Sequence, residues 1–344
     1  MIKEVLLDEE KELVRKFLKD YKLEMDKVEK TYYSVDDDDQ INGTISYDGN
    51  IIKCLAVSSD TRSENLASSL VSKVLSEFQS LKIYSYKVFT KPIYKKIFES
   101  LGFRPLVQDD YFVYLEGGID GIEKEIKDLK TRIEFSLGPI NEDSDIGCCV
   151  INANPMTLGH EYLIEEISKR HDKVIVFVVE EDKSFYRFEE RMSMVYLTCQ
   201  RLDNVVVVPS GTYIVSSLTF PSYFLSSDDV ARERVMVDGL IFEKYFMKEL
   251  FIKKRYVGTE KKEKMVYYNK ILKDILKERL EILDRFEYDG EIVSASVVRS
   301  LVNKGKIDEA MKYIPRSIQS LFKIITVNKS EWYPWIKRRT SQFY

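Results

Sequence analysis

The chain has 344 residues, a length that favours two domains, and a formal net charge of −4 at pH 7. Lysines and glutamates are mixed along it, which argues against a nucleic-acid partner, and no apolar run approaches the ~20 residues of a membrane-spanning helix. The four cysteines lack metal-ligand spacing and the charged N-terminus shows no secretory pattern, so we expect a reduced, cytoplasmic protein.

The first third of the sequence predicts a small α+β domain. Apolar residues at helical spacing indicate a helix over residues 9–19. Two strands, 41–47 and 51–57, are joined by the turn residues Tyr47-Asp48-Gly49-Asn50. The remaining elements expected in this domain are a helix at 64–78, a strand at 83–89, a helix at 93–100 and a strand at 110–115.

This order of elements resembles the GNAT acetyltransferase fold. The segment Phe98-Glu99-Ser100-Leu101-Gly102-Phe103 is similar to the closing segment of that fold. The acetyl-CoA loop of the family has the form R-x-x-G-x-G/A, whose glycines let backbone amides wrap a pyrophosphate. Here Arg62 is present, whereas Ser63 and Asn65 stand where glycines are expected. The domain, residues 1–116, is therefore either a retained scaffold or docking domain, which we favour, or an acetyltransferase.

A charged connector over residues 117–144 leads into a second domain, residues 145–344, in which strands and helices alternate. The expected strands are 146–151, 174–179, 205–208, 255–257 and 281–285, and the expected helices are about 160–171, 188–201, 228–250, 264–278 and 295–304. The second strand is apolar on both faces, as in a strand covered by helices on each side. The alternation predicts a doubly wound parallel sheet, which binds ligands beyond the carboxyl ends of its strands.

A phosphate site is expected directly after the first of these strands. A polar loop leads there into a helix, whose first amides have no partner inside the helix. Pro155 keeps Asn154 out of helical geometry, and Gly159 omits a side chain where the backbone comes close to a ligand. Thr157 and His160 add side-chain donors beside the free amides.

A second polar cluster follows the fifth strand. Ser294 stands where a helix N-cap belongs, and Ser296 and Arg299 lie in the first turns of the helix that it begins. These three side chains are able to clamp phosphates. Because both clusters follow strands of one parallel sheet, we expect them to meet at the same edge. The alternative is an ordinary capped helix with a solvated arginine.

These two clusters carry a specific resemblance. Thr157-Leu158-Gly159-His160 resembles the T/H-x-G-H signature of the nucleotidylyltransferases, and the segment from Val293 to Arg299 is similar to their I-S-x-x-x-V-R motif, with Val in place of Ile. The resemblance implies a Rossmann-like, HUP-type domain that attacks the α-phosphate of ATP, with ATP and Mg²⁺ as cofactors. It implies catalytic roles for His160, Thr157 and Arg299, nucleotide contacts from Asn154, Gly159, Ser294, Ser296 and Gly258, and no metal-ligating side chain.

The stretches between the motifs resemble one family more closely, the citrate lyase ligases. They are Gly211–Ser217, Phe220–Leu225 and Arg255–Glu260, whereas Lys261 departs from the proline expected there. The resemblance implies that acetate and ATP give acetyl-adenylate and pyrophosphate. The acetyl group then passes to the phosphoribosyl-dephospho-CoA thiol on the acyl carrier subunit of citrate lyase.

Other functions remain open at this point. Within enzymes, the alternatives are a ligase for another carrier thiol, such as that of malonate decarboxylase, and an adenylyltransferase acting on a pantetheine-like phosphate. A GNAT-type acetyltransferase with a nucleotide-binding module is an alternative of another class, and a non-catalytic nucleotide sensor is a third.

Two further predictions concern single side chains of the second domain. His171 ends its helix beside Asp172, which indicates a C-terminal capping residue. Lys183 and Arg191 follow the second strand and are candidates to meet phosphate or the incoming substrate. Arg191 is equally well placed to pair with a neighbouring glutamate.

Overall fold

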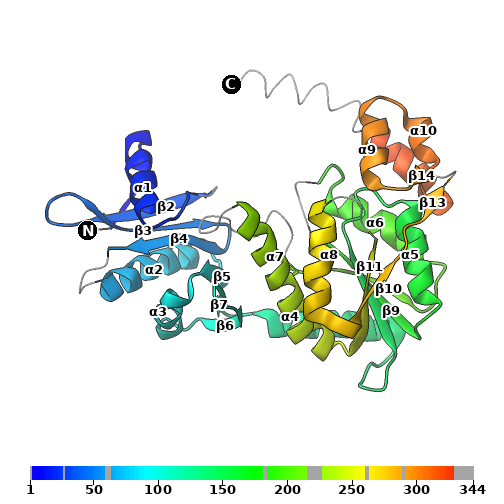
Figure 1. Cartoon of the computed structure of the whole chain (residues 1–344), viewed down its shortest axis with the longest axis horizontal. Helices are drawn as coiled ribbons and strands as arrows, with labels where there is room; N and C mark the ends of the chain where they lie inside the picture. The colour runs from blue at the N-terminus through cyan, green and yellow to red at the C-terminus, as the bar shows by residue number, and fades with distance from the viewer. Residues whose placement is uncertain are drawn as a thin grey trace. The chain divides into compact units, whose positions relative to one another are not determined.

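The structure is a computed structural model that describes residues 2–25, 28–58, 63–180, 184–214, 227–259, 263–288 and 291–328. These residues fall into two units, each with its own sheet (Figure 1). The first unit takes in the described residues of Met1–Glu125 and Thr219–Ile241, and the second those of Ile126–Leu218 and Phe242–Tyr344.

The described part of the first unit contains a seven-stranded mixed sheet with the order β1-β2-β3-β4-β5-β7-β6. The strands are β1 (Ile2–Glu4), β2 (Lys30–Val35), β3 (Ile41–Asp48), β4 (Ile51–Val57), β5 (Ser85–Thr90), β6 (Arg104–Gln108) and β7 (Val113–Gly118). The helices that alternate with these strands are α1 (Asp8–Asp20), α2 (Ser63–Ser80) and α3 (Lys95–Ser100), the last preceded by a 3-10 turn, η1 (Pro92–Tyr94).

Helix α2 closes the core of this unit. Leu70, Val74 and Phe78 are completely buried along one face of the helix. The ring of Phe78 meets that of Tyr47 on β3 edge to face, with 5.1 Å between the centroids. The predicted helix and strands of this segment are therefore confirmed, whereas β1, β2 and β6 were not predicted.

The second unit carries a five-stranded, fully parallel sheet of described strands in the order β10-β9-β8-β11-β12. The strands are β8 (Ile146–Ile151), β9 (Lys173–Val178), β10 (Val205–Pro209), β11 (Ile252–Gly258) and β12 (Leu280–Leu283). Helices α5 (Leu158–Ser168) and α6 (Phe188–Cys199) cover one face, and α8 (Glu263–Leu276) covers the other (Figure 1).

The order of the strands reverses at β8. The chain moves outward from β8 through β9 to β10 and then returns to the other side of β8 with β11 and β12. Ligands of open α/β sheets bind at such a reversal, beyond the carboxyl ends of the strands. The predicted doubly wound parallel sheet is confirmed, and its reversal point lies between β8 and β11.

The predicted helix at 228–250 is divided between the two units. Its first part, α7 (Ser227–Ile241), belongs to the first unit, where it contacts β6. Its second part, the π-helical η2 (Phe242–Met247), belongs to the second unit and packs Phe242 and Phe246 against Phe177 of β9. Helix α4 (Ile122–Leu137) occupies much of the segment proposed as a connector.

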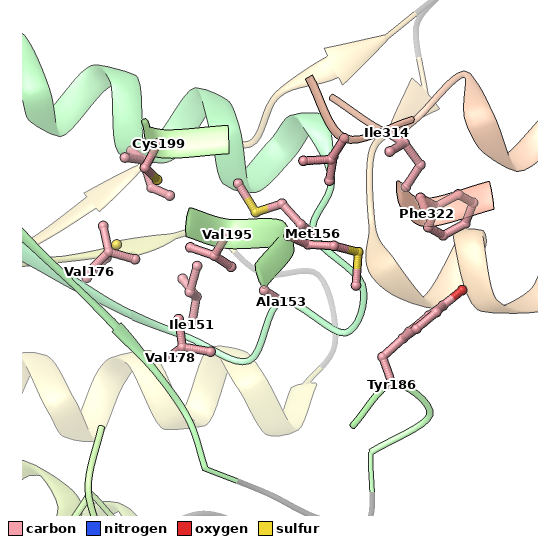
Figure 2. Close-up of a cluster of buried hydrophobic side chains, with 14 of the residues drawn as sticks. Ile151, Ala153, Met156, Val176, Val178, Tyr186, Val195, Cys199, Ile314 and Phe322 are labelled. Carbon is pink, nitrogen blue, oxygen red and sulfur yellow. The ribbon is translucent and has the colours of Figure 1, made fainter. Parts of the chain in front are cut away.

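The C-terminal part of the described chain is a group of short helices. They are α9 (Ala295–Asn303), α10 (Ile307–Met311), η4 (Arg316–Ile318) and a helical segment at 319–328. Figure 2 shows Met156, from the loop after β8, lying between Val195 of α6 and the side chains Ile314 and Phe322 of this group. The group therefore shares one apolar core with the sheet domain. Of the helices that the structure describes, none is long and apolar enough to cross a bilayer.

Candidate active site

The loop that follows β8 is held in place by its own buried side chains. Ala153 and Met156 are buried in the core, and Thr157 is exposed by just 1%. Fixed in this way, the loop presents the start of α5 at the carboxyl edge of the sheet, beside the reversal point. The sequence placed the phosphate site at this position.

The imidazole of His160 is oriented by Thr157. Its Nδ1 atom accepts a hydrogen bond from the backbone N–H of Thr157 at 3.2 Å and lies 2.9 Å from the Thr157 hydroxyl. A backbone N–H can only donate, so Nδ1 carries no proton and the neutral ring is protonated on Nε2. Burial, together with the nearby positive charge of Arg285, lowers the pKa of His160 to about 4. At neutral pH the residue is therefore an uncharged Nε2–H donor.

The amides at the start of α5 are partly used within the protein. Leu158 donates its N–H to the carbonyl of Tyr313 at 2.9 Å, and His160 donates to the carbonyl of Thr157 at 3.0 Å. The N–H of Gly159 is the one of these three without a carbonyl partner among the described residues. An anion at this helix start therefore meets the Gly159 amide and the imidazole rather than a full turn of free amides.

Arg299 brings the two sequence motifs together. Its Nη1 atom donates to the backbone carbonyl of Asn154, 145 residues earlier in the chain, and its Nη2 atom lies 3.5 Å from the hydroxyl of Ser296. Ser294 caps α9 as predicted, because its hydroxyl accepts from the N–H of Val297 at 3.4 Å. Val298 and Val302 form the buried face of α9, whereas Val297 is exposed.

Gly159 is required by a neighbour that the sequence did not reveal. A Cβ atom at this position would lie 3.2 Å from the carbonyl oxygen of Val293, the residue that precedes Ser294. The missing side chain thus lets the helix carrying His160 approach the backbone of the second motif. The closest protein neighbour of this glycine is that backbone.

The other two predicted nucleotide contacts lie on loops around the same edge. The side-chain oxygen of Asn154 accepts from the N–H of Tyr186 at 3.0 Å, which ties the loop after β8 to the loop after β9. Gly258 ends β11, and its carbonyl accepts from the amide of Asn269 at 3.0 Å. Both residues thus border the reversal point, between the two motifs.

Arg191 is a structural residue rather than one facing a ligand. Its side chain is fully buried and donates to the carbonyls of Asn152, Val179 and Tyr186, at 2.7, 2.8 and 3.1 Å. The guanidinium therefore holds together the loops that follow β8 and β9. It meets carbonyl oxygens where the sequence suggested a phosphate or a glutamate. Lys183 lies outside the described residues, as does Arg62 of the predicted acetyl-CoA loop.

The predicted role of His171 is wrong. Helix α5 ends at Ser168, and the buried ring of His171 lies between two polar partners. Its Nδ1 lies 2.8 Å from a carboxylate oxygen of Asp145, and its Nε2 lies 2.8 Å from the hydroxyl of Tyr256. The helix is shorter than the periodicity suggested, so the ring reaches the interior instead of the last carbonyls of the helix.

Arg285 is a site residue that sequence reasoning missed. It follows β12 at the carboxyl edge, and its backbone N–H donates to the hydroxyl of Thr259, which follows β11, at 3.1 Å. After burial, its positive charge is the second cause of the lowered pKa of His160. The available signal was positional, because a basic residue directly after a strand of a parallel sheet lies at the ligand-binding edge.

A parallel sheet with a neutral histidine donor and an arginine beside its reversal point is the arrangement expected of an α/β domain with a ligand site at the carboxyl edge of its sheet. A family profile described as citrate lyase ligase C-terminal domain matches residues 146–322, and the chain belongs to this family. A second profile, the acetyltransferase (GNAT) domain, matches residues 5–116. The predicted pair of folds is therefore confirmed.

Relatives match across both units. The citrate pro-3S-lyase ligase of Haemophilus influenzae is 29% identical over 317 residues, which are 88% of this chain and 92% of the relative. The enzyme of the same name from Escherichia coli is 29% identical over 314 residues, 88% of this chain and 87% of the relative. A solved N-acyl amino acid synthase from uncultured soil microbes is 12% identical, with a TM-score of 0.31, and is matched over 35% of this chain and 89% of its own.

Proposed function

We propose that this protein is a cytoplasmic, AMP-forming ligase that uses ATP to acetylate the phosphoribosyl-dephospho-CoA thiol on the acyl carrier subunit of citrate lyase. Acetate attacks the α-phosphate of ATP, pyrophosphate leaves, and the acetyl group of the resulting acetyl-adenylate passes to the thiol as AMP departs. The ligase relatives support this assignment, and the contact between Arg299 and the Asn154 carbonyl carries it, because it joins two phosphate-binding motifs at one edge.

The chemistry requires positioning and charge neutralisation rather than a covalent enzyme intermediate. In our proposal the Nε2–H group of His160 donates to the phosphate oxygen that gains charge, while Thr157 holds the ring in that tautomer. The guanidinium of Arg299 and the hydroxyls of Ser294 and Ser296 face the departing pyrophosphate.

Mg²⁺ would be held chiefly by the phosphates in this proposal, where it neutralises their charge. Within the described ranges, no group of three or more His, Cys, Asp or Glu side chains is arranged to hold a metal ion. The donor set around His160 and Arg299 consists of hydrogen-bond donors and a cation, which suit the anionic oxygens of the nucleotide.

The test is acetate-dependent release of AMP and pyrophosphate with the thiol form of the carrier. We expect His160→Ala to lower the rate by a factor of roughly 10² to 10³, the usual cost of one transition-state donor, in a folded protein. A His160→Ala enzyme with the wild-type rate would remove this residue from the mechanism. Formation of an adenylylated product in place of AMP would instead indicate the adenylyltransferase alternative.

The limits of the domains are also part of the proposal: residues 1–116 for the GNAT-like domain, 117–144 for the connector and 145–344 for the ligase domain, within whose range α7 packs with the first unit. We assign the first domain to a scaffold or docking role. Titration of the full chain with acetyl-CoA checks this role, because tight, saturable binding would support the acetyltransferase alternative.

A further inference from the structure

The backbone of Arg285 is held in place at the edge where β11 and β12 end. Gly258 of β11 pairs with Leu283 of β12, and the N–H of Thr259 donates to the carbonyl of Leu283 at 2.8 Å. The hydroxyl of Thr259 then accepts from the N–H of Arg285 at 3.1 Å. These bonds extend the pairing of the two strands by one step, so Arg285 begins from a fixed position.

The residue after Arg285 connects this position to both motifs. The ring of Phe286 packs on that of Tyr162 in α5, with 5.5 Å between the centroids. The carbonyl of Phe286 accepts from the N–H of Val293 at 3.2 Å. Arg285 therefore lies close to the helix that carries His160 and to Val293, the residue that precedes Ser294.

The side chain of Arg285 lies beside Gly258 at the carboxyl edge of the sheet. A Cβ atom at position 258 would lie 3.8 Å from Cγ of Arg285, and the positive charge of Arg285 acts on His160. Arg299 brings a second cation to the loop that precedes the helix carrying His160. Arg285 and Arg299 thus bring two positive charges to the same edge of the sheet, where they favour the binding of an anion.

We propose that Arg285 is a polyphosphate-binding residue of this site, acting from the β12 edge while Arg299 acts from α9. The inference rests on the proposed nucleotide-binding function and adds a third side chain to the two recognisable motifs. A planar guanidinium is suited to two parallel hydrogen bonds with a phosphate, which a lysine does not reproduce.

The test is the affinity for MgATP and for inorganic tripolyphosphate, measured by calorimetry on the full chain. We expect Arg285→Gln to weaken both by on the order of tenfold or more, as for loss of a charge-assisted hydrogen bond. Arg285→Lys should recover part of this affinity. The matched control is Arg279→Gln, at the opposite end of β12, where the arginine pairs with Glu243. This control should bind like the wild type.

A second measurement separates the role of Arg285 from a merely structural one. The chain holds two histidines, so the imidazole signals of His160 and His171 are readily assigned by NMR with a His160→Gln reference. In Arg285→Gln the pKa of His160 should rise, and in Arg285→Lys it should stay low. Bound MgATP should shift the guanidinium signal of Arg285 in the wild type.

Three outcomes would count against the proposal. Wild-type affinity for MgATP in Arg285→Gln would overturn it while leaving the ligase assignment intact. Absence of MgATP binding by the wild-type chain would defeat both proposals together. Should Arg285→Gln fail to fold by circular dichroism, an Arg285→Lys chain with unchanged affinity for MgATP and tripolyphosphate would overturn the inference by itself.

Discussion

The hydrogen bond from the Thr157 amide to Nδ1 determines what His160 is able to do. A protonated ring has no acceptor at Nδ1, so protonation would break this bond and leave the Thr157 N–H facing another donor. The ring therefore works as a neutral donor over the ordinary pH range. Its contribution to catalysis should not follow the ionisation near pH 6.5 that an unperturbed histidine shows.

This tuning predicts an acid-sensitive component of stability. The folded-state pKa of His160 is about 4, below the unfolded value of about 6.5, so the unfolded chain binds more protons between these values. The free energy of unfolding should therefore fall as the pH falls from about 6.5 toward about 4. In His160→Gln, whose amide oxygen still accepts from Thr157, this component should be absent. Urea midpoints at pH 7 and 4.5 measure it, and an equal loss in both proteins would contradict it.

At the same scale, Arg191 shows how one buried charge fixes the site loops. Replacing it with leucine should destabilise the fold by roughly 3 kcal/mol, because three carbonyls lose their donor inside the protein. The control is Arg187→Ala, where the side chain is 75% exposed and a change within about 0.5 kcal/mol is expected. Denaturant unfolding compares the two variants, and similar losses in both would refute the structural role of Arg191.

At the scale of elements, the close approach of α5 to the backbone of Val293, just before α9, brings the two motifs together. Gly159→Ala places a Cβ atom 3.2 Å from the Val293 carbonyl, so the second motif must shift by a few tenths of an ångström. Alanine would otherwise favour the helix by roughly 0.5–1 kcal/mol. We expect a loss of stability of about 1 kcal/mol and weaker MgATP binding instead. Thermal unfolding and calorimetry measure these two effects.

Gly258→Ala is the matched comparison at the end of β11. Its added Cβ atom would make an ordinary contact, 3.8 Å from Cγ of Arg285, so the stability of the ligand-free chain should change by less than about 0.5 kcal/mol. A drop in MgATP affinity without a drop in stability would mark the place where the nucleotide passes Gly258. Unchanged affinity would remove Gly258 from the nucleotide contacts.

The elements that carry strong periodic signals were predictable from sequence, and those defined by neighbours were not. The strand at 146–151 has the predicted bounds, because an apolar run there ends abruptly at polar residues. Ser294 begins α9 as its side-chain chemistry indicates. Arg285 was missed because one arginine among 53 basic residues carries no local signal. The role of His171 was predicted wrongly for a similar reason: its partners Asp145 and Tyr256 are distant in sequence, so no local pattern points to them.

At the scale of the whole molecule, α7 is the element whose position the sequence did not indicate. Periodicity predicted one helix at 228–250. It did not indicate that the first part of this helix packs with the first unit and the second part with the second unit. Glu233, Val235 and Val237 of α7 are nearly fully buried. The neighbouring charge of Asp109 and, above all, burial raise the pKa of Glu233 to about 7.

Because the pKa of Glu233 is raised, the free energy of unfolding should be lower at alkaline pH than at acidic pH. Its folded-state pKa lies above the ordinary 4.5, so its favourable contribution is complete below about pH 4.5 and is lost as the pH rises through about 7. Glu233→Gln should have a higher melting temperature than the wild type at pH 8 and nearly the same one at pH 4.5. The control is Glu249→Gln, at a side chain that is 54% exposed. A wild-type melting profile that tracks that of Glu233→Gln across this range would contradict the prediction.

The packing of α7 with the first unit also affects how such chains can recombine in evolution. Neither unit is one uninterrupted stretch of sequence. Helix α7 lies between β10 and β11 in the sequence, but it packs against β6 and belongs to the first unit. A single recombination breakpoint near residue 125 would transplant a domain without one of its own helices. Exchange of the complete acetyltransferase-like unit between relatives thus requires three crossovers, one near residue 125 and one at each end of residues 219–241. This requirement favours the joint inheritance of both units.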